Sequence, residues 1–527
     1  NPGFYGMPGA IRVVTGEVNP SGHTTATFAA NSLSAPSAEN FGLHAYNYGS
    51  KTPRAAGDSF VSYNEGIYVG YRYYETRYED AVLAQGNAGN FDYDAQVVYP
   101  FGYGLSYTDF SWSDYKMTET ADGFALNVTV TNTGKAAGKE VVQAYLQNPY
   151  TEYDRANRIE KPAVELVGFA KTDILQPGES QTVQIDVDKS AMKVFDAYGA
   201  GTYILEAGDY YLTAASNAHE AAKNILAAKG AEVDGNAAMT ALYNQAQTDT
   251  KAFATAETGA AVTAQMADAD ITTYDADFTY LSRSDWTGTW PTTDGEVSDQ
   301  ISTWGNPING TDANGNPASY TYYKTISSED LAKLDSFDSL NTTDPSTLTD
   351  ELVYGKDNGL GLIDMRGLDY NDPKWNDLLD QLTPSDYQTL ITQSGYGTAA
   401  IKSVDKPAAT DRDTATGLIN FGFDASGNLY FKGNITHCGV IVLAQTYNDD
   451  LATHYGENIG DESYYLDVDG WYAPAVNMHR TAFSGRNSEY YSEDPFIGGH
   501  IASLECEGVA SRGMYVFVKH YAINDQE

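Results

Sequence analysis

The sequence predicts a multidomain protein that combines α/β parts with an all-β part. Its 527 residues are enough for three or four domains. Residues 110–218 contain several short strand patterns punctuated by Gly and Pro turns, which is typical of a β-sandwich. Towards the end of the chain, short apolar runs alternate with helix-length segments, which favours the first part of a β/α barrel.

The first 109 residues alternate turns with short apolar runs, which fits the end of an α/β layer. The sandwich pattern follows: residues 124–131 alternate apolar and polar side chains, and Asn-Thr-Gly at 132–134 ends the run as a turn. Residues 141–146, 180–187 and 208–214 repeat the strand signal.

Residues 219–277 are predicted to form a helical connector, because this stretch is rich in alanine and residues 237–246 favour helix. Further on, residues 373–382 place Trp375, Leu378, Leu379 and Leu382 on one helical face. Thr383 and Pro384 are then expected to cap and begin the next helix.

Two apolar runs, residues 440–443 and 514–518, are predicted to be short buried strands of the barrel. Lys519 and His520 follow the second run directly, at its carboxyl end. In a β/α barrel this end of the strands is where ligands bind. A lysine or arginine there can donate hydrogen bonds to the hydroxyls of a neutral polar ligand such as a sugar.

The formal net charge of −40 argues against nucleic acids and anionic membranes as binding partners. Such a charge repels nucleic acids and anionic membranes and is compatible with a neutral substrate, although it also fits simple solubility. The chain has no run of eighteen apolar residues, so no membrane-spanning helix is predicted. No cofactor is expected, and no metal either, because Cys438 and Cys506 lack the spacing of metal ligands.

Residues 485–495 read Gly-Arg-Asn-Ser-Glu-Tyr-Tyr-Ser-Glu-Asp-Pro, and residues 519–524 read Lys-His-Tyr-Ala-Ile-Asn. These strings resemble the barrel domain of the family 3 glycoside hydrolases, and its β-glucosidases most closely. The resemblance implies that Arg486, Lys519 and His520 line the subsite for the sugar to be cleaved. It implies the same for Asp413, although Thr414 and Ala415 stand where the family's Asp-Gly-Pro-x-Gly-Leu element has Gly-Pro.

The resemblance extends to the rest of the chain. Residues 63–74 look like the closing part of the family's α/β sandwich domain, and residues 99–107 like the run that leads into its fibronectin type III-like domain. The implied domains are 1–109 (C-terminal part of the α/β sandwich domain), 110–218 (fibronectin type III-like), 219–277 (helical connector) and 278–527 (N-terminal part of the (β/α)8-type barrel). This order matches a domain-inverted subgroup.

The family cleaves glycosides with two carboxylates, a nucleophile and an acid/base. The resemblance places both outside this chain, so we expect an internal piece of a longer polypeptide whose remaining part is its main partner, with a homo-oligomer left open. Ser-Asp-Trp at 284–286 copies the family's nucleophile tripeptide, yet its position before the barrel predicts that Asp285 only caps a turn. Glu65 is expected to be a loop residue near the site and not the proton donor.

The resemblance therefore implies a retaining β-glucosidase that releases terminal β-D-glucosyl units from β-glucosides or cello-oligosaccharides. Two alternatives stay open. One is a non-catalytic carbohydrate-binding or scaffolding fragment that keeps the sugar subsite, and the other is a β-xylosidase of the same family.

Overall fold

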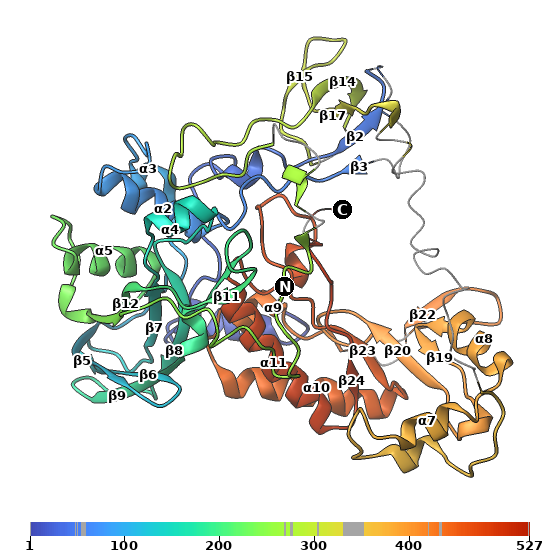
Figure 1. Ribbon diagram of the computed structural model, residues 1–527. Coiled ribbons are helices and arrows are strands. Elements are labelled where there is room, and N and C mark those ends of the chain that lie inside the picture. Colours follow the sequence, from blue (N-terminus) through green and yellow to red (C-terminus); the bar gives the residue numbers. More distant parts are fainter. Residues whose placement is uncertain are drawn as a thin grey trace.

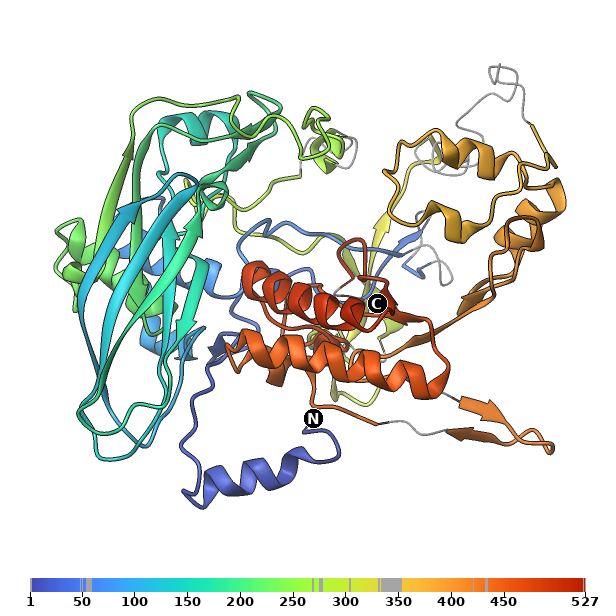
Figure 2. The same ribbon diagram turned by 90° about the horizontal axis from the view of Figure 1, so that it is seen from below.

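The computed structural model describes residues 2–47, 49, 51–53, 59–267, 270–273, 278–302, 305–329, 332, 353–419, 421–431, 435–524 and 526. A β-sandwich lies on one side of the molecule and an α/β part on the other (Figures 1 and 2). Among the described residues, no helix has both the length and the apolar character needed to cross a membrane.

The sandwich consists of two antiparallel sheets. One has the order β5-β6-β9, formed by Phe110–Glu119, Gly123–Asn132 and Ser180–Asp188. The other has the order β13-β12-β7-β8, formed by Thr240–Gln245, Gly208–Ala215, Val141–Gln147 and Glu165–Lys171. The four predicted strands are confirmed as β6, β7, β9 and β12. Strand β6 alternates buried and partly exposed side chains along its length, as its sequence pattern predicts.

Strand β7 is buried on both faces. Val142, Ala144 and Leu146 belong to the core between the two sheets. Val141 and Tyr145 belong instead to the core that the sandwich shares with the α/β part. The outer face of this sheet is therefore an interface within the molecule and not a solvent-exposed surface.

In the described part of the connector, the only α-helix lies at its start. Helix α5 spans Ala218–Ala228. The helix expected at residues 237–246 is wrong: a short 3₁₀ turn at Ala237–Met239 leads into strand β13, which pairs antiparallel with β12. Without β13, the backbone groups along this edge of β12 would lack strand partners, and this pairing outweighs the helical propensity of the alanines.

The α/β part contains a five-stranded sheet of order β18-β19-β20-β23-β24. Strands β20 (Ala409–Asp413), β23 (Gly470–Tyr472) and β24 (Tyr515–Val516) run parallel. Helix α10 (Asp449–Leu466) connects the first two and helix α11 (Pro495–Ser511) the last two, and the two helices lie side by side (Figure 2). The β/α alternation is thus present, while the parallel strands described form an open sheet and no closed barrel.

The strand expected at residues 440–443 is also wrong, because Val440–Ala444 forms helix α9. Its side chains Val440, Leu443 and Ala444 lie in the shared core. A four-residue apolar run that is buried can be strand or helix, and periodicity alone does not separate the two.

A second sheet, of order β14-β17-β2-β3, joins distant parts of the chain (Figure 1). Strands β14 (Glu296–Ile301) and β17 (Tyr320–Thr325) belong to the segment predicted to open the barrel. Strands β2 (His44–Asn47) and β3 (Ser59–Phe60) belong to the first 109 residues, and β2 pairs parallel with β17. The sheet therefore contains strands from both sides of the predicted boundary at residue 278.

Helices α7 (Lys374–Leu379) and α8 (Pro384–Thr392) are confirmed, and Thr383 caps α8 as predicted. Trp375, Leu378 and Leu382 pack in a small core, whereas Leu379 is exposed.

The remaining α-helices and strands of the described residues are α1 Gly6–Val14, α2 Tyr71–Val82, α3 Tyr93–Gln96, α4 Glu152–Asn157, β1 Phe28–Ala29, β4 Val97–Tyr99, β10 Val194–Asp196, β11 Thr202–Ile204, β15 Gly310–Thr311, β16 Pro317–Ala318, β18 Ser394–Gly395, β19 Gly397–Thr398, β21 Phe421–Phe423 and β22 Leu429–Phe431.

Candidate functional site

Polar side chains gather where the parallel strands end. Asp413 is the last residue of β20, Tyr472 is the last residue of β23, and Lys519 follows shortly after β24. Because the three strands run parallel, their carboxyl ends lie at the same edge of the sheet. This is the edge at which open α/β sheets and β/α barrels bind their ligands.

A network of ion pairs connects Asp413 and Lys519 with Glu489 and Arg486. Lys519 Nζ donates to Asp413 Oδ1 at 2.7 Å and lies 3.6 Å from Glu489 Oε2. Arg486 forms a two-pronged contact with Glu489, from Nε to Oε1 at 3.0 Å and from Nη2 to Oε2 at 2.7 Å. Charge-assisted bonds of this kind fix both side chains in orientation as well as in distance.

The network lies on the wall of a cavity of about 600 Å³. Its lining comes mainly from the loop after β20, from residues 486–489 and from Lys519; it consists of Tyr396, Arg412, Asp413, Thr414, Ala415, Thr416, Ile419, Gly439, Arg486, Ser488, Glu489 and Lys519. The volume falls within the range of pockets that bind small molecules. Three of the four predicted site residues, Asp413, Arg486 and Lys519, thus meet at one cavity.

His520, the fourth predicted site residue, is not part of the cavity lining. Its backbone N–H donates to Asn477 Oδ1 at 2.9 Å, and its Nδ1 lies 3.1 Å from the same oxygen. Its ring meets that of Tyr490 edge-on, with 6.1 Å between centroids. In this structure His520 lies beside the cavity, where Asn477 orients its ring.

The charges in the cavity are nearly balanced. Arg412, Arg486 and Lys519 line it together with the carboxylates Asp413 and Glu489. Burial acts to raise the pKa of Asp413, but the hydrogen bond and charge of Lys519 outweigh this effect and hold the pKa below its usual value. Asp413 is therefore ionised at neutral pH and accepts hydrogen bonds.

Sequence reasoning missed Arg412, Glu489 and Tyr396. Glu489 stands three residues after Arg486, a spacing that brings two side chains together on a helical turn. Arg412 immediately precedes Asp413 on β20; its Nη1 donates to the Asp411 carbonyl at 2.7 Å, whereas its buried Nε has no hydrogen-bond partner among the described residues. Tyr396 comes from the β18–β19 turn, which no motif marked.

The loop after β20 follows a path that a glycine would adopt more easily. Thr414 has φ +117°, a backbone conformation that β-branched residues rarely occupy. The buried indole of Trp471 holds this loop by donating to the carbonyls of Thr414 at 2.8 Å and Gly417 at 3.1 Å. The strained loop thereby keeps Asp413 at the cavity wall.

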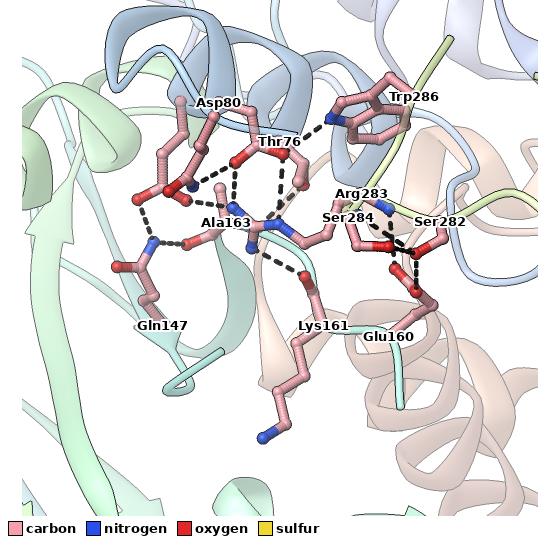
Figure 3. Close-up of polar contacts among 12 residues, drawn as sticks. Thr76, Asp80, Gln147, Glu160, Lys161, Ala163, Ser282, Arg283, Ser284 and Trp286 are labelled. Carbon is pink, nitrogen blue, oxygen red and sulfur yellow. Dashed lines mark hydrogen bonds and ion pairs between the residues drawn. The ribbon is translucent and has the colours of Figure 1, made fainter. Parts of the chain in front are cut away.

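Asp285 caps an exposed turn, as predicted. Its Oδ1 accepts from the Gly288 N–H at 3.0 Å and from Asn87 Nδ2 at 2.9 Å, and these bonds, the one from Asn87 foremost, lower its pKa. The neighbouring Trp286 is fully buried and donates to Asp80 (Figure 3). Asp285 is absent from the cavity lining.

Glu65 is buried and is not part of the cavity lining. Both of its carboxylate oxygens accept from the guanidinium of Arg480, which also donates to the Ser62 carbonyl at 2.7 Å. This ion pair ties the segment before α2 to the loop after β23.

Comparison with known protein families agrees with this architecture. Residues 140–218 match the family model "Fibronectin type III-like domain", and residues 425–526 match "Glycosyl hydrolase family 3 N terminal domain". Together the matches define a modular protein in which a fibronectin-like domain precedes the β/α domain, the order predicted from the sequence. Over residues 425–526 the chain is therefore similar to the N-terminal domain of glycoside hydrolase family 3.

Individual relatives match along the whole chain. It is 29% identical to Beta-glucosidase A of Butyrivibrio fibrisolvens over 100% of this chain and 56% of that protein. It is also 29% identical to Beta-glucosidase of Ruminococcus albus, over 100% of this chain and 45% of that one. A solved β-glucosidase from Paenibacillus barengoltzii superimposes with a TM-score of 0.60 at 25% identity, covering 99% of this chain and 48% of the other. The chain thus spans about half the length of these relatives.

Proposed function

We propose that the protein, as part of a larger polypeptide, hydrolyses β-glucosides or cello-oligosaccharides and releases terminal non-reducing β-D-glucosyl units. The observation that carries the proposal is the convergence of Asp413, Arg486 and Lys519 on one cavity at the carboxyl edge of parallel strands. The relatives named β-glucosidases support the same class of substrate.

The chemistry of the cavity suits a sugar. Asp413 carries carboxylate oxygens that can accept from hydroxyls, and Lys519 and Arg486, which line the same cavity, carry N–H donors. The ion pairs keep these groups in place before the ligand arrives, so little side-chain entropy is lost when a sugar binds. We propose that His520 contributes through its ring once the site is complete, oriented by Asn477.

We propose a retaining double displacement, with a nucleophile and an acid/base that lie outside residues 1–527. Retention uses two carboxyl groups about 5–5.5 Å apart. The carboxylates that line the described cavity, Asp413 and Glu489, each bind a cation instead. The relatives extend over about twice the length of this chain, which leaves room for both groups and for further strands that would complete a (β/α)8-type barrel.

Two measurements on the complete protein test the proposal. Proton NMR of the first product formed from a β-glucoside should show β-glucose, which is the outcome of retention. Turnover of the matching β-xyloside should be slower, whereas faster turnover would favour the β-xylosidase alternative. Binding of glucose without turnover of either substrate would favour the non-catalytic carbohydrate-binding or scaffolding alternative.

A further inference from the structure

A second cavity lies at the junction of three segments that are distant in sequence. Its volume is about 750 Å³. The first segment is residues 66–72 at the start of α2, the second comprises residues 155–165 and 193–198 of the sandwich, and the third includes residues 278–284. None of its lining residues belongs to the lining of the first cavity.

Positive charge is concentrated in this second cavity. Five cationic residues line it, against two acidic ones, Glu160 and Glu165; the cations are Arg72, Arg155, Arg158, Lys161 and Lys193. The chain as a whole has 31 Lys and Arg against 71 Asp and Glu. A local excess of cations in so acidic a chain points to an anionic ligand.

Two of the five cations are already neutralised. Lys161 binds Asp154 at 2.7 Å and also pairs with Glu206, and its ammonium extends away from the Glu160 cluster (Figure 3). Arg155 pairs with Glu152 at 2.6 Å. Their charges add little to the attraction of a ligand.

The other three cations retain capacity for a ligand. Arg72 pairs with Glu165 through Nη2 at 2.9 Å and is also attracted by Asp494, so it contributes least of the three. Arg158 and Lys193 form no ion pair within the part of the chain that the structure describes, and lie over aromatic rings. The guanidinium of Arg158 is 5.2 Å from the Tyr198 centroid, and the ammonium of Lys193 is 4.8 Å from that of Tyr203.

Aromatic side chains also line the second cavity. Phe195, Tyr198, Phe278 and Tyr280 are part of its lining. Their faces offer stacking surfaces for a flat ring or for the apolar face of a sugar ring. A ligand that uses the whole lining therefore has a ring as well as a negative charge.

The walls of the cavity are fixed by a buried polar cluster (Figure 3). Glu160 accepts from Ser282 Oγ at 2.5 Å and from the Arg283 N–H at 3.0 Å. The Arg283 guanidinium donates to Asp80 and to the Lys161 carbonyl, the latter at 3.0 Å. These bonds hold the segment at 278–284 against the sandwich and α2, so the cavity is formed before any ligand binds.

We propose that this second cavity binds a small ligand with a carboxylate on a six-membered ring, either a uronic acid sugar or an aromatic carboxylate. A guanidinium matches the two oxygens of a carboxylate in geometry, and Arg158 and Lys193 line the same cavity as Phe195 and Tyr280, on which the ring would stack. The net charge of −40 does not oppose this, because physiological salt screens charges beyond about 8 Å.

The test compares pairs of ligands that differ only in the carboxylate. Titration calorimetry or saturation-transfer NMR would measure D-glucuronate against D-glucuronamide, and benzoate against benzyl alcohol, on the whole protein. One carboxylate should bind at least about tenfold more tightly than its neutral counterpart. Which pair shows the preference identifies the source of the ligand, and no preference in either pair overturns the proposal.

Variants locate the binding. Arg158→Asn removes the guanidinium while keeping a residue that tolerates the left-handed backbone at φ +54°, and Lys193→Gln removes the ammonium. Each should weaken carboxylate binding about tenfold, whereas Arg366→Ala, at an exposed position elsewhere, should not. Lys519→Ala should leave it unchanged, which separates this cavity from the glucoside site. Unchanged binding in the folded Arg158 and Lys193 variants refutes the assignment.

Discussion

At the scale of single residues, the site depends on charged side chains that hold one another before a ligand arrives. Lys519 is central, because it contacts both Asp413 and Glu489. Removing a charged donor from a sugar costs about 1.5–3 kcal/mol, which is roughly ten- to a hundredfold in affinity. Lys519→Ala in the complete protein should therefore raise the glucose inhibition constant by this factor. Lys402→Ala, at an exposed position, is the control, and an unchanged constant for Lys519→Ala would contradict the assignment.

For Asp285, in contrast to Lys519, we expect a substitution to have little effect. Because it only caps an exposed turn, Asp285→Asn should change turnover by no more than about twofold, whereas loss of a nucleophile costs several powers of ten. Peptide mapping after trapping with a fluorinated glucoside gives an independent reading. A label on Asp285 would make it the nucleophile and would place a catalytic group inside this chain.

A glycine is required at position 70, because the carboxylate of Glu493 packs directly against its Cα. Gly70 has φ +56° and ψ −136°, and a Cβ there would lie 2.2 Å from Glu493 Cδ, whose oxygens accept from Thr27 and from the Tyr71 N–H at the start of α2. Gly70→Ala should lower the free energy of unfolding by about 3 kcal/mol or more. Gly66→Ala, at φ +55° with open space, should cost only about 1 kcal/mol. Equal losses in urea unfolding would show that the contact with Glu493 is unimportant.

At the scale of elements, helix α11 carries a buried acid that makes stability depend on pH. Burial raises the pKa of Glu505 to about 8, and the hydroxyl of Tyr491 is its hydrogen-bond donor among the described residues. The folded state thus holds this proton more tightly than the unfolded state, whose carboxyl has the ordinary value of 4.5. The stability that this group contributes is complete below pH 4.5 and is lost as the pH rises to about 8.

Glu505→Gln removes this titration. The free energy of unfolding of the variant, relative to the wild type, should therefore rise between pH 5 and pH 8 by a few kcal/mol at most. Urea unfolding at several pH values measures the difference, and Glu507→Gln on the same helix is the control. A difference that does not change with pH would mean that Glu505 is charged in the folded protein.

The sequence predicted elements well where the local pattern and the tertiary environment agree. Strand β6 faces a core on one side only and therefore alternates visibly, and α8 is capped by Thr383 within its own segment. The prediction failed at β13, which forms a strand although alanines surround it, because β12 offers an edge. It failed again at α9, because the apolar run of four residues is too short to show a helical period. The motifs located Asp413, Arg486 and Lys519, whereas Arg412 and Tyr396 reach the cavity only through the fold.

At the scale of the whole molecule, the sandwich and the α/β part share one hydrophobic core. Val141, Tyr145 and Leu166 of the sandwich pack in the same core as Trp471, Ile497 and Ile501. We therefore expect calorimetry to show one cooperative thermal transition for both parts. Tyr145→Ala should destabilise this single transition by about 3–5 kcal/mol. Two separate transitions, of which the variant shifts only one, would contradict a shared core.

The parallel pairing of β2 with β17 has a consequence for synthesis on the ribosome. Strand β2 leaves the ribosome before its partner β17, which follows roughly 280 residues later. At about 5–20 residues per second, the edge of β2 waits for roughly 15–55 s. The sandwich strands β5 to β12 emerge during this interval and pair among themselves. In a crowded cell the nascent chain must therefore protect an unfinished sheet, and other β-rich chains are competitors for its open edge.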